Sequence, residues 1–209
     1  MPHEPTAYES ENLAASLRAY LSETGFAFTG VTAKEATPAI TRAVANWAKA
    51  SGWKCRSEAP MRYIDPPRPM DMGCRRVWWP SWSAYLDLRL LREDGPPIAV
   101  EIDREDTGTA MDKLRDEALR GRPALWIRWH GPVRAELPAG VARLRLPTRT
   151  TRSPIRYTLT AVDDTAAITC GEPVCPGALE DALARDRLRI ADEKRAAALR
   201  PSYPPLIRC

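Results

Sequence analysis

The pattern of apolar and polar residues predicts two helices near the start of the chain. Within residues 9–22, leucines recur every four residues, which places them on one face of a packing helix. Residues 24–32 are predicted to be a turn-rich connection. A second helix is predicted to begin at Thr37, an N-cap residue followed by Pro38, and to end before Gly52, which favours a left-handed C-cap.

Apolar and polar residues alternate cleanly in two neighbouring segments. In residues 84–91, three leucines are expected on one face of a strand and Asp87 on the other. In residues 98–103, Glu101 and Asp103 are expected to share one face, opposite the apolar side chains. Only a short turn separates the two segments, so they should form an antiparallel hairpin.

The remaining segments complete a mixed α/β order. In chain order we predict a strand beginning at residues 53–59, a long proline-rich loop over 60–81, a helix from Thr109 to Gly121, strands over 123–129 and 141–146, a linker over 149–154, an edge strand over 155–163 and a charged helix over 177–200. The core order is thus helix, strand, strand, strand, helix, strand, strand. We expect a central mixed sheet flanked by helices, with an N-terminal helix and connection (1–35), a core (36–147) and a C-terminal extension (148–209).

Composition narrows the class of protein only slightly. A chain of 209 residues suits one domain with terminal additions, and its net charge of +4 permits a phosphate-binding surface without requiring one. Without a leader-like N-terminus or a membrane-length apolar stretch, a soluble cytoplasmic protein with no membrane partner is expected. Five cysteines are an odd number, which favours reduced thiols.

The predicted hairpin gathers acidic residues that suggest metal chemistry. Asp87, Glu101 and Asp103 would converge on one face, where unpaired carboxylates repel one another and lose hydration. A hard divalent cation, Mg²⁺ or Mn²⁺, would resolve this conflict and would suit phosphodiester hydrolysis. In the alternative interpretation, the three carboxylates are exposed or are paired with Arg89 and Arg104.

Residues 36–147 resemble the PD-(D/E)XK nuclease superfamily in their order of helix, Asp-bearing strand, strand ending in Glu-x-acid, helix and strand. Within it, VEID followed by DKLRDEALRGRPALWIRW is similar to the branch of very-short-patch repair endonucleases, in which an acidic residue replaces the motif lysine. The resemblance implies a restriction-endonuclease-like fold (αβββαβ), DNA as substrate, and Asp87, Glu101 and Asp103 as catalytic and metal-binding residues. Lys113, in the following helix, corresponds to the place to which some members relocate the lysine.

His130 has two interpretations. The repair-endonuclease branch tends to use histidine, and His130 would be a base near neutral pH if it reached the site. The alternative is an ordinary loop residue after the strand over residues 123–129.

Two further groups carry weaker signals. Trp78, Trp79 and Trp82, beside Arg75 and Arg76, would stack on bases and clamp phosphates in a DNA-facing loop, or the aromatic rings would instead fold back over the sheet. Cys170 and Cys175 have the spacing of half a zinc site, which Cys55 and Cys74 would have to complete.

The leading hypothesis from the sequence is a metal-dependent DNA endonuclease acting in defence, repair or the biology of mobile elements. The alternative is a catalytically inactive nuclease-fold module that binds DNA or docks on a protein partner through its C-terminal helix. A purely structural subunit of a larger complex is a third hypothesis.

Overall fold

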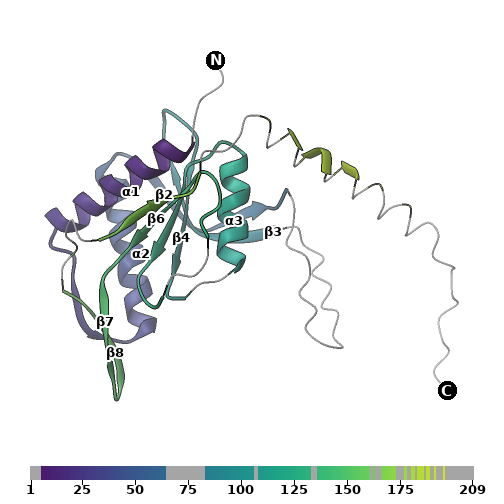
Figure 1. The fold of residues 1–209 in the computed structure, drawn as a ribbon. Coiled ribbons are helices and arrows are strands. Elements are labelled where there is room, and N and C mark those ends of the chain that lie inside the picture. Colours follow the sequence, from purple (N-terminus) through teal and green to yellow (C-terminus); the bar gives the residue numbers. More distant parts are fainter. Residues whose placement is uncertain are drawn as a thin grey trace, which may run out of the picture.

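The computed structural model describes residues 6–64, 83–105, 108–132, 136–160, 162 and 166–172, and scattered residues between 177 and 195. These residues form a mixed α/β fold in which helices cover both faces of a six-stranded sheet (Figure 1). The elements are α1 (Thr6–Glu23), β1 (Phe28–Val31), α2 (Ala33–Ala50), β2 (Lys54–Arg62), β3 (Ser83–Leu91), β4 (Ile98–Asp103), α3 (Gly108–Leu119), β5 (Ala124–Arg128), β6 (Val141–Arg145), β7 (Thr148–Arg152), β8 (Ile155–Leu159) and β9 (Ile168–Cys170).

The large sheet has the strand order β2-β3-β4-β5-β6-β9. Its strands β4, β5 and β6 are parallel, and the other neighbours are antiparallel. Helix α3 makes the crossover between β4 and β5, as a parallel pair requires. The predicted order from α2 to β6 is therefore found, and so is the predicted antiparallel hairpin of β3 and β4.

The core lies in two layers, one on each face of this sheet. On one face, α1 and α2 bury a cluster that includes Leu17, Ile40 and Trp47 against the even-numbered residues of β4. On the other face, α3 buries Met111 and Leu114 against β4, β5 and β6. The sheet is covered on both faces, which explains why β5 is apolar at nearly every position and buried throughout.

A smaller sheet, β1-β8-β7, corrects three predictions. Residues 28–31, predicted as part of a turn, pair with β8, and residues 149–152, predicted as a linker, lie in β7. β8 is the central strand of this sheet and not an edge strand. The β-branched threonines of β7 favour a strand. These short segments are nevertheless stable as strands only because β8 pairs with both β7 and β1.

Helix α2 begins earlier than predicted. Its N-cap is Thr32, whose backbone N–H and hydroxyl both donate to the Glu35 carboxylate, at 2.7 and 2.8 Å. Thr37 and Pro38 consequently lie inside the helix. The capping interaction outweighs the proline signal, because Thr32 and Glu35 satisfy the first turn before Pro38 is reached.

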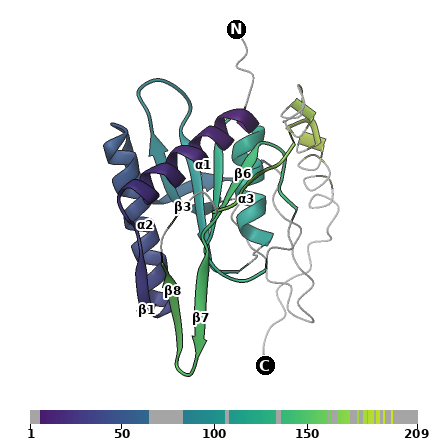
Figure 2. The same ribbon diagram turned by 60° about the vertical axis from the view of Figure 1, so that its left-hand side comes forward.

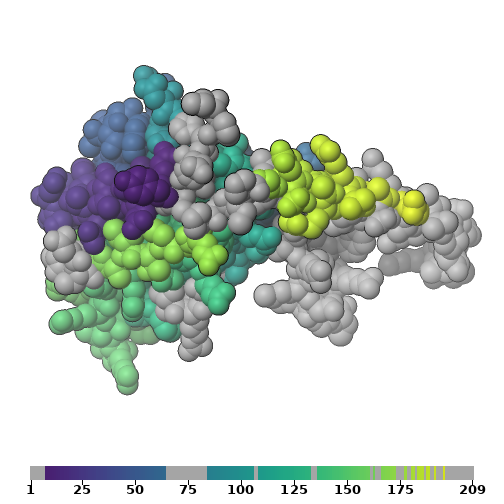
Figure 3. Space-filling view, turned by 45° about the horizontal axis from the view of Figure 1, so that its top comes forward, coloured from purple at the N-terminus to yellow at the C-terminus, as the bar shows by residue number. Residues whose placement is uncertain are grey.

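The C-terminal segment is described only in part. Between residues 180 and 195 the described residues are helical and exposed, among them Leu183 and Leu188. They lie away from the sheet (Figures 1 and 3). None of the helices in the described part of the chain is long and apolar enough to cross a membrane.

Candidate active site

Asp87 lies at a point in β3 where the sheet opens on both sides. The paired positions of β3 and β4 run from Leu90 to Leu88, so Asp87, the residue before Leu88, lies just beyond them. On the other side, the paired positions of β2 and β3 skip Glu58, the residue opposite Asp87. Glu58 has a positive φ of 46°, a conformation that non-glycine residues adopt at a cost of about 1–2 kcal/mol. Strained backbone of this kind is concentrated at functional sites.

The opening of the sheet changes which way β3 faces. Leu88 and Leu90 pack with α1 and α2 as one cluster, whereas Leu86 packs with α3 on the opposite face. The prediction that these three leucines share one face was therefore wrong. Alternation holds only in regular strand backbone, and the irregular backbone opposite Asp87 interrupts it.

Side chains take over the hydrogen bonds that the ladder lacks. The Asp87 N–H donates to Glu101 Oε1 at 3.2 Å, and the Ile102 N–H donates to Asp87 Oδ2 at 2.7 Å. The two carboxylates thus fill the gap between β3 and β4, each held by the backbone of the other strand. This exchange brings Asp87 and Glu101 together, as the sequence predicted.

Lys113 reaches this gap from α3. Its Nζ donates to Glu101 Oε2 at 2.6 Å and to the carbonyl oxygen of Tyr85 in β3 at 2.9 Å. The Glu101 side chain is 3% exposed and the Lys113 side chain 11% exposed, so the contact between them is shielded from water. Helix α3 therefore places a lysine directly beside Glu101.

Burial dominates the electrostatics of Glu101. Loss of hydration raises its pKa from 4.5 to about 8, and the negative charge of Asp87 adds to the rise, although Lys113 and the Asp87 N–H act in the opposite direction. The lysine only partly compensates the buried carboxylate, which favours a further positive charge at this position.

Asp103 lies on the same face of β4 as Glu101 and is held by a tryptophan. Trp126 Nε1 of β5 donates to Asp103 Oδ2 at 2.9 Å. Burial raises the pKa of Asp103, and Asp87 raises it as well, whereas Trp126, Lys113 and Arg128 lower it. The charge of Asp87 thus influences both other carboxylates.

Sequence reasoning missed three residues that shape this site. Trp126 is placed by the parallel pairing of β4 with β5, which no local pattern reveals. Glu58 depends on backbone geometry alone. Tyr63 follows β2, and burial together with Asp112, Asp116 and Glu101 raises the pKa of its phenol to about 12.

The donor set suits a hard divalent cation in kind. All three carboxylates offer oxygen ligands, and neither Asp87 Oδ1 nor Asp103 Oδ1 accepts a hydrogen bond from the described residues. As arranged, however, no three acidic, histidine or cysteine side chains of the described residues are grouped closely enough to hold a metal ion. Both Glu101 oxygens are engaged, so a cation between Asp87 and Asp103 fits the chemistry and would draw Glu101 as a third ligand only by loosening its bond to Lys113.

The alternative pairing of the carboxylates with arginines is not found among the described residues. Arg89 instead forms an ion pair with Glu117 of α3 at 3.3 Å, and Arg104 pairs with its neighbour Glu105. His130 lies just after β5, where its ring packs against Tyr157 at 5.0 Å, and it is not a partner of the carboxylates. Burial, with Arg104 and Arg128 nearby, lowers its pKa.

The two cysteines that the structure describes, Cys55 and Cys170, do not lie together. Cys55 is in β2 and Cys170 is in β9, at opposite edges of the six-stranded sheet. Five strand spacings of about 4.8 Å put them roughly 24 Å apart, too far for one zinc ion. The other two cysteines of the predicted zinc site, Cys74 and Cys175, lie outside the described residues. So do the five predicted DNA-facing residues, Arg75, Arg76, Trp78, Trp79 and Trp82.

Comparisons of the chain with protein-family models, with curated proteins and with solved structures find no match.

Proposed function

We propose that this protein is a metal-dependent DNA endonuclease with a restriction-endonuclease-like core, close in kind to the very-short-patch repair branch. The observation that carries the proposal is the position of Lys113, whose Nζ lies 2.6 Å from Glu101 Oε2 across the opened β3–β4 pair. A lysine, two neighbouring carboxylates and a third one two residues on are groups that can serve metal-assisted phosphodiester hydrolysis. A structural salt bridge alone would explain Lys113, but not the irregular backbone on both sides of Asp87.

Each side chain has a distinct role in the proposed reaction. Asp87 and Asp103 would hold Mg²⁺ or Mn²⁺ through carboxylate oxygens, with Glu101 completing the set. The bound cation would lower the pKa of a water ligand and offset the charge that develops on the phosphate. Lys113 would donate a hydrogen bond to a non-bridging phosphate oxygen, since its ammonium group already lies beside the carboxylates. Trp126 would keep Asp103 in place.

A second candidate function is an inactive nuclease-fold module that binds DNA or a protein. It is favoured by one observation: no three acidic, histidine or cysteine side chains of the described residues are grouped to hold a metal ion. In that case the Lys113–Glu101 pair would only neutralise buried charge, and the exposed helical residues between 180 and 195 would be the docking element.

Cleavage assays separate the two candidates. Supercoiled plasmid and single-stranded DNA would be incubated with Mg²⁺, Mn²⁺ or EDTA, and the wild type compared with Asp87→Ala, Glu101→Ala and Lys113→Ala. The proposal expects metal-dependent cleavage that falls at least about a hundredfold in each variant. Matched controls are Asp94→Ala and Lys49→Ala, which remove exposed residues of the same types far from the carboxylates.

The outcomes are decisive in both directions. Cleavage that survives both Asp87→Ala and Glu101→Ala would sink the nuclease proposal. A wild type that cleaves nothing and takes up neither metal in calorimetry, yet still retards DNA in a gel, would establish the inactive module instead.

A further inference from the structure

Strands β7 and β8 form an antiparallel ribbon that stands out from the body of the protein (Figures 2 and 3). We call residues 148–159 the arm. Pairing runs without interruption from Thr148 and Leu159 to Arg152 and Ile155, so the turn is only two residues long. At its base the arm is fixed by β1 and by the buried side chains of Tyr157 and Leu159.

The arm and the strand before it carry positive charge only. Residues 137–162 contain five arginines and no Asp or Glu, whereas 27 acidic residues in 209 correspond to about three in a stretch of this length. Arg145, Arg149 and Arg152 are exposed, and none of them forms an ion pair with a described residue. Arg156, the last arginine of this stretch, is near enough to help lower the pKa of Glu35, after the hydrogen bonds from Thr32.

A cavity of about 340 Å³ lies where the arm leaves the large sheet. Its lining includes Arg145 and Arg149 together with His130 and Thr148. Thr148 Oγ1 donates to the carbonyl oxygen of Trp129, which fixes the first residue of the arm to the end of β5. The cavity thus presents two guanidinium groups and an imidazole, and its charged lining residues are all basic.

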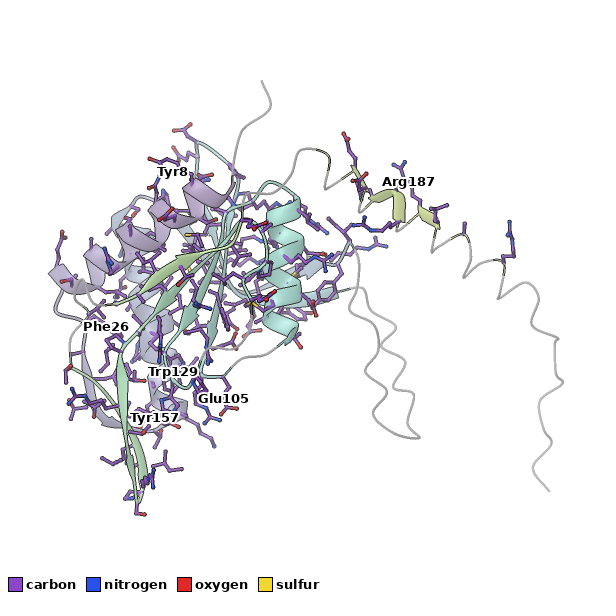
Figure 4. The ribbon with its side chains drawn as sticks, viewed as in Figure 1. Tyr8, Phe26, Glu105, Trp129, Tyr157 and Arg187 are labelled. Carbon is purple, nitrogen blue, oxygen red and sulfur yellow. The ribbon has the colours of Figure 1, made fainter. Side chains whose placement is uncertain are left out.

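The arm starts at the edge of the sheet that also carries Asp103. Strands β4, β5 and β6 are parallel, so Asp103, Arg128 and Arg145 lie side by side at their carboxyl ends. Two strand spacings put Arg145, three residues before the arm, about 10 Å from Asp103. The connection is direct: the Trp129 N–H donates to the Asp103 carbonyl oxygen at 3.2 Å, and the Trp129 ring packs on Tyr157 of the arm at 5.0 Å (Figure 4).

We propose that the arm and its basal cavity bind duplex DNA, with Arg145, Arg149 and Arg152 contacting backbone phosphates and the ribbon lying in a groove. A two-stranded ribbon fits the major groove, and arginine forks match phosphate oxygens. The exposed threonines of β7 add hydroxyl donors for the same backbone. The choice of DNA as occupant rests on the proposed function, which this surface deepens by naming what holds the substrate beside Asp103.

The test measures binding in EDTA, so that it does not depend on cleavage. A fluorescent DNA duplex of about 30 base pairs would be titrated with wild type and with the triple variant Arg145→Gln, Arg149→Gln and Arg152→Gln. For the triple variant we expect a dissociation constant at least about tenfold larger than that of the wild type at 0.1 M salt. The slope of log K against log salt should be smaller in magnitude by about 2.7, or 0.9 per lost phosphate contact.

A second triple variant with the same loss of charge serves as the control. Arg42→Gln, Lys49→Gln and Arg56→Gln change exposed residues of α2 and β2, and binding should change less than threefold. Both triple variants should keep the circular dichroism spectrum and the melting temperature of the wild type, because all six side chains are exposed.

Several results would overturn the proposal. Equal weakening of DNA binding by the two triple variants would do so, and so would unchanged DNA binding by the arm variant or a wild type that binds no DNA duplex. The proposal would also fail if the arm substitutions weakened only the binding of vesicles containing phosphatidylserine, or only the binding of double-stranded RNA. A wild type that binds duplex through the arm but cleaves nothing would refute the nuclease activity and leave the arm proposal standing. Cleavage that persists in an arm variant with normal DNA affinity would support the nuclease activity and refute the arm proposal.

Discussion

Replacing Glu101 by glutamine tests the electrostatics of the carboxylate centre directly. The Glu101 side chain is almost fully buried, and its pKa is raised from 4.5 to about 8 by burial and by Asp87. The folded chain therefore holds a proton that the unfolded chain has already released between these two values. The stabilisation is complete below the unfolded value and is lost as the pH rises through the folded one.

The size of the effect follows from the two pKa values. Because the folded chain binds the Glu101 proton more tightly than the unfolded chain, the unfolding free energy of the wild type should fall by about 4 kcal/mol between pH 5 and pH 9. Glu101→Gln lacks this proton, so its stability should vary less over the same range by that amount. The stability of the variant relative to that of the wild type should therefore be highest at pH 9, although the variant is expected to have lost any DNA cleavage.

Urea unfolding followed by tryptophan fluorescence at pH 5, 7 and 9 in EDTA would measure this difference. Glu93→Gln is the matched control, because Glu93 is an exposed glutamate in the turn between β3 and β4. Its pH profile should run parallel to that of the wild type. If the profile of Glu101→Gln is also parallel within about 1 kcal/mol, burial of Glu101 does not govern its titration and the reasoning is refuted.

Three further substitutions test other parts of the structure by urea unfolding. Glu117→Gln should destabilise the fold by about 3 kcal/mol, because this side chain is 1% exposed and pairs with two arginines, and an exposed Glu180→Gln control should not. Ser10→Ala should cost about 1–3 kcal/mol, because its buried hydroxyl joins Gly140 of one loop to the first residue of β5, and no loss would contradict this bridge. Glu58→Gly should raise stability by up to about 1 kcal/mol by relieving the positive φ; a destabilised variant would show that the conformation is not strained.

The sequence alone determined the local elements that carry their own signals. Leucines spaced four apart define α1, strict alternation defines β4, and Gly121 ends α3 with a positive φ of 72°. These features depend on residues close together in the chain, so periodicity and capping rules are sufficient. The same rules placed Glu101 and Asp103 on one face of a strand.

Only the tertiary structure decided how these elements combine into a site. Lys113 meets Glu101 because the crossover helix α3 packs back on β4. Asp87 lies outside the regular pairing of β2 with β3 because the backbone of β2 is irregular at Glu58. Likewise, β1 is a strand only because a segment more than a hundred residues later pairs with it. Contacts between distant segments have no periodic signature in the sequence, since they depend on how whole elements pack and not on the preferences of neighbouring residues.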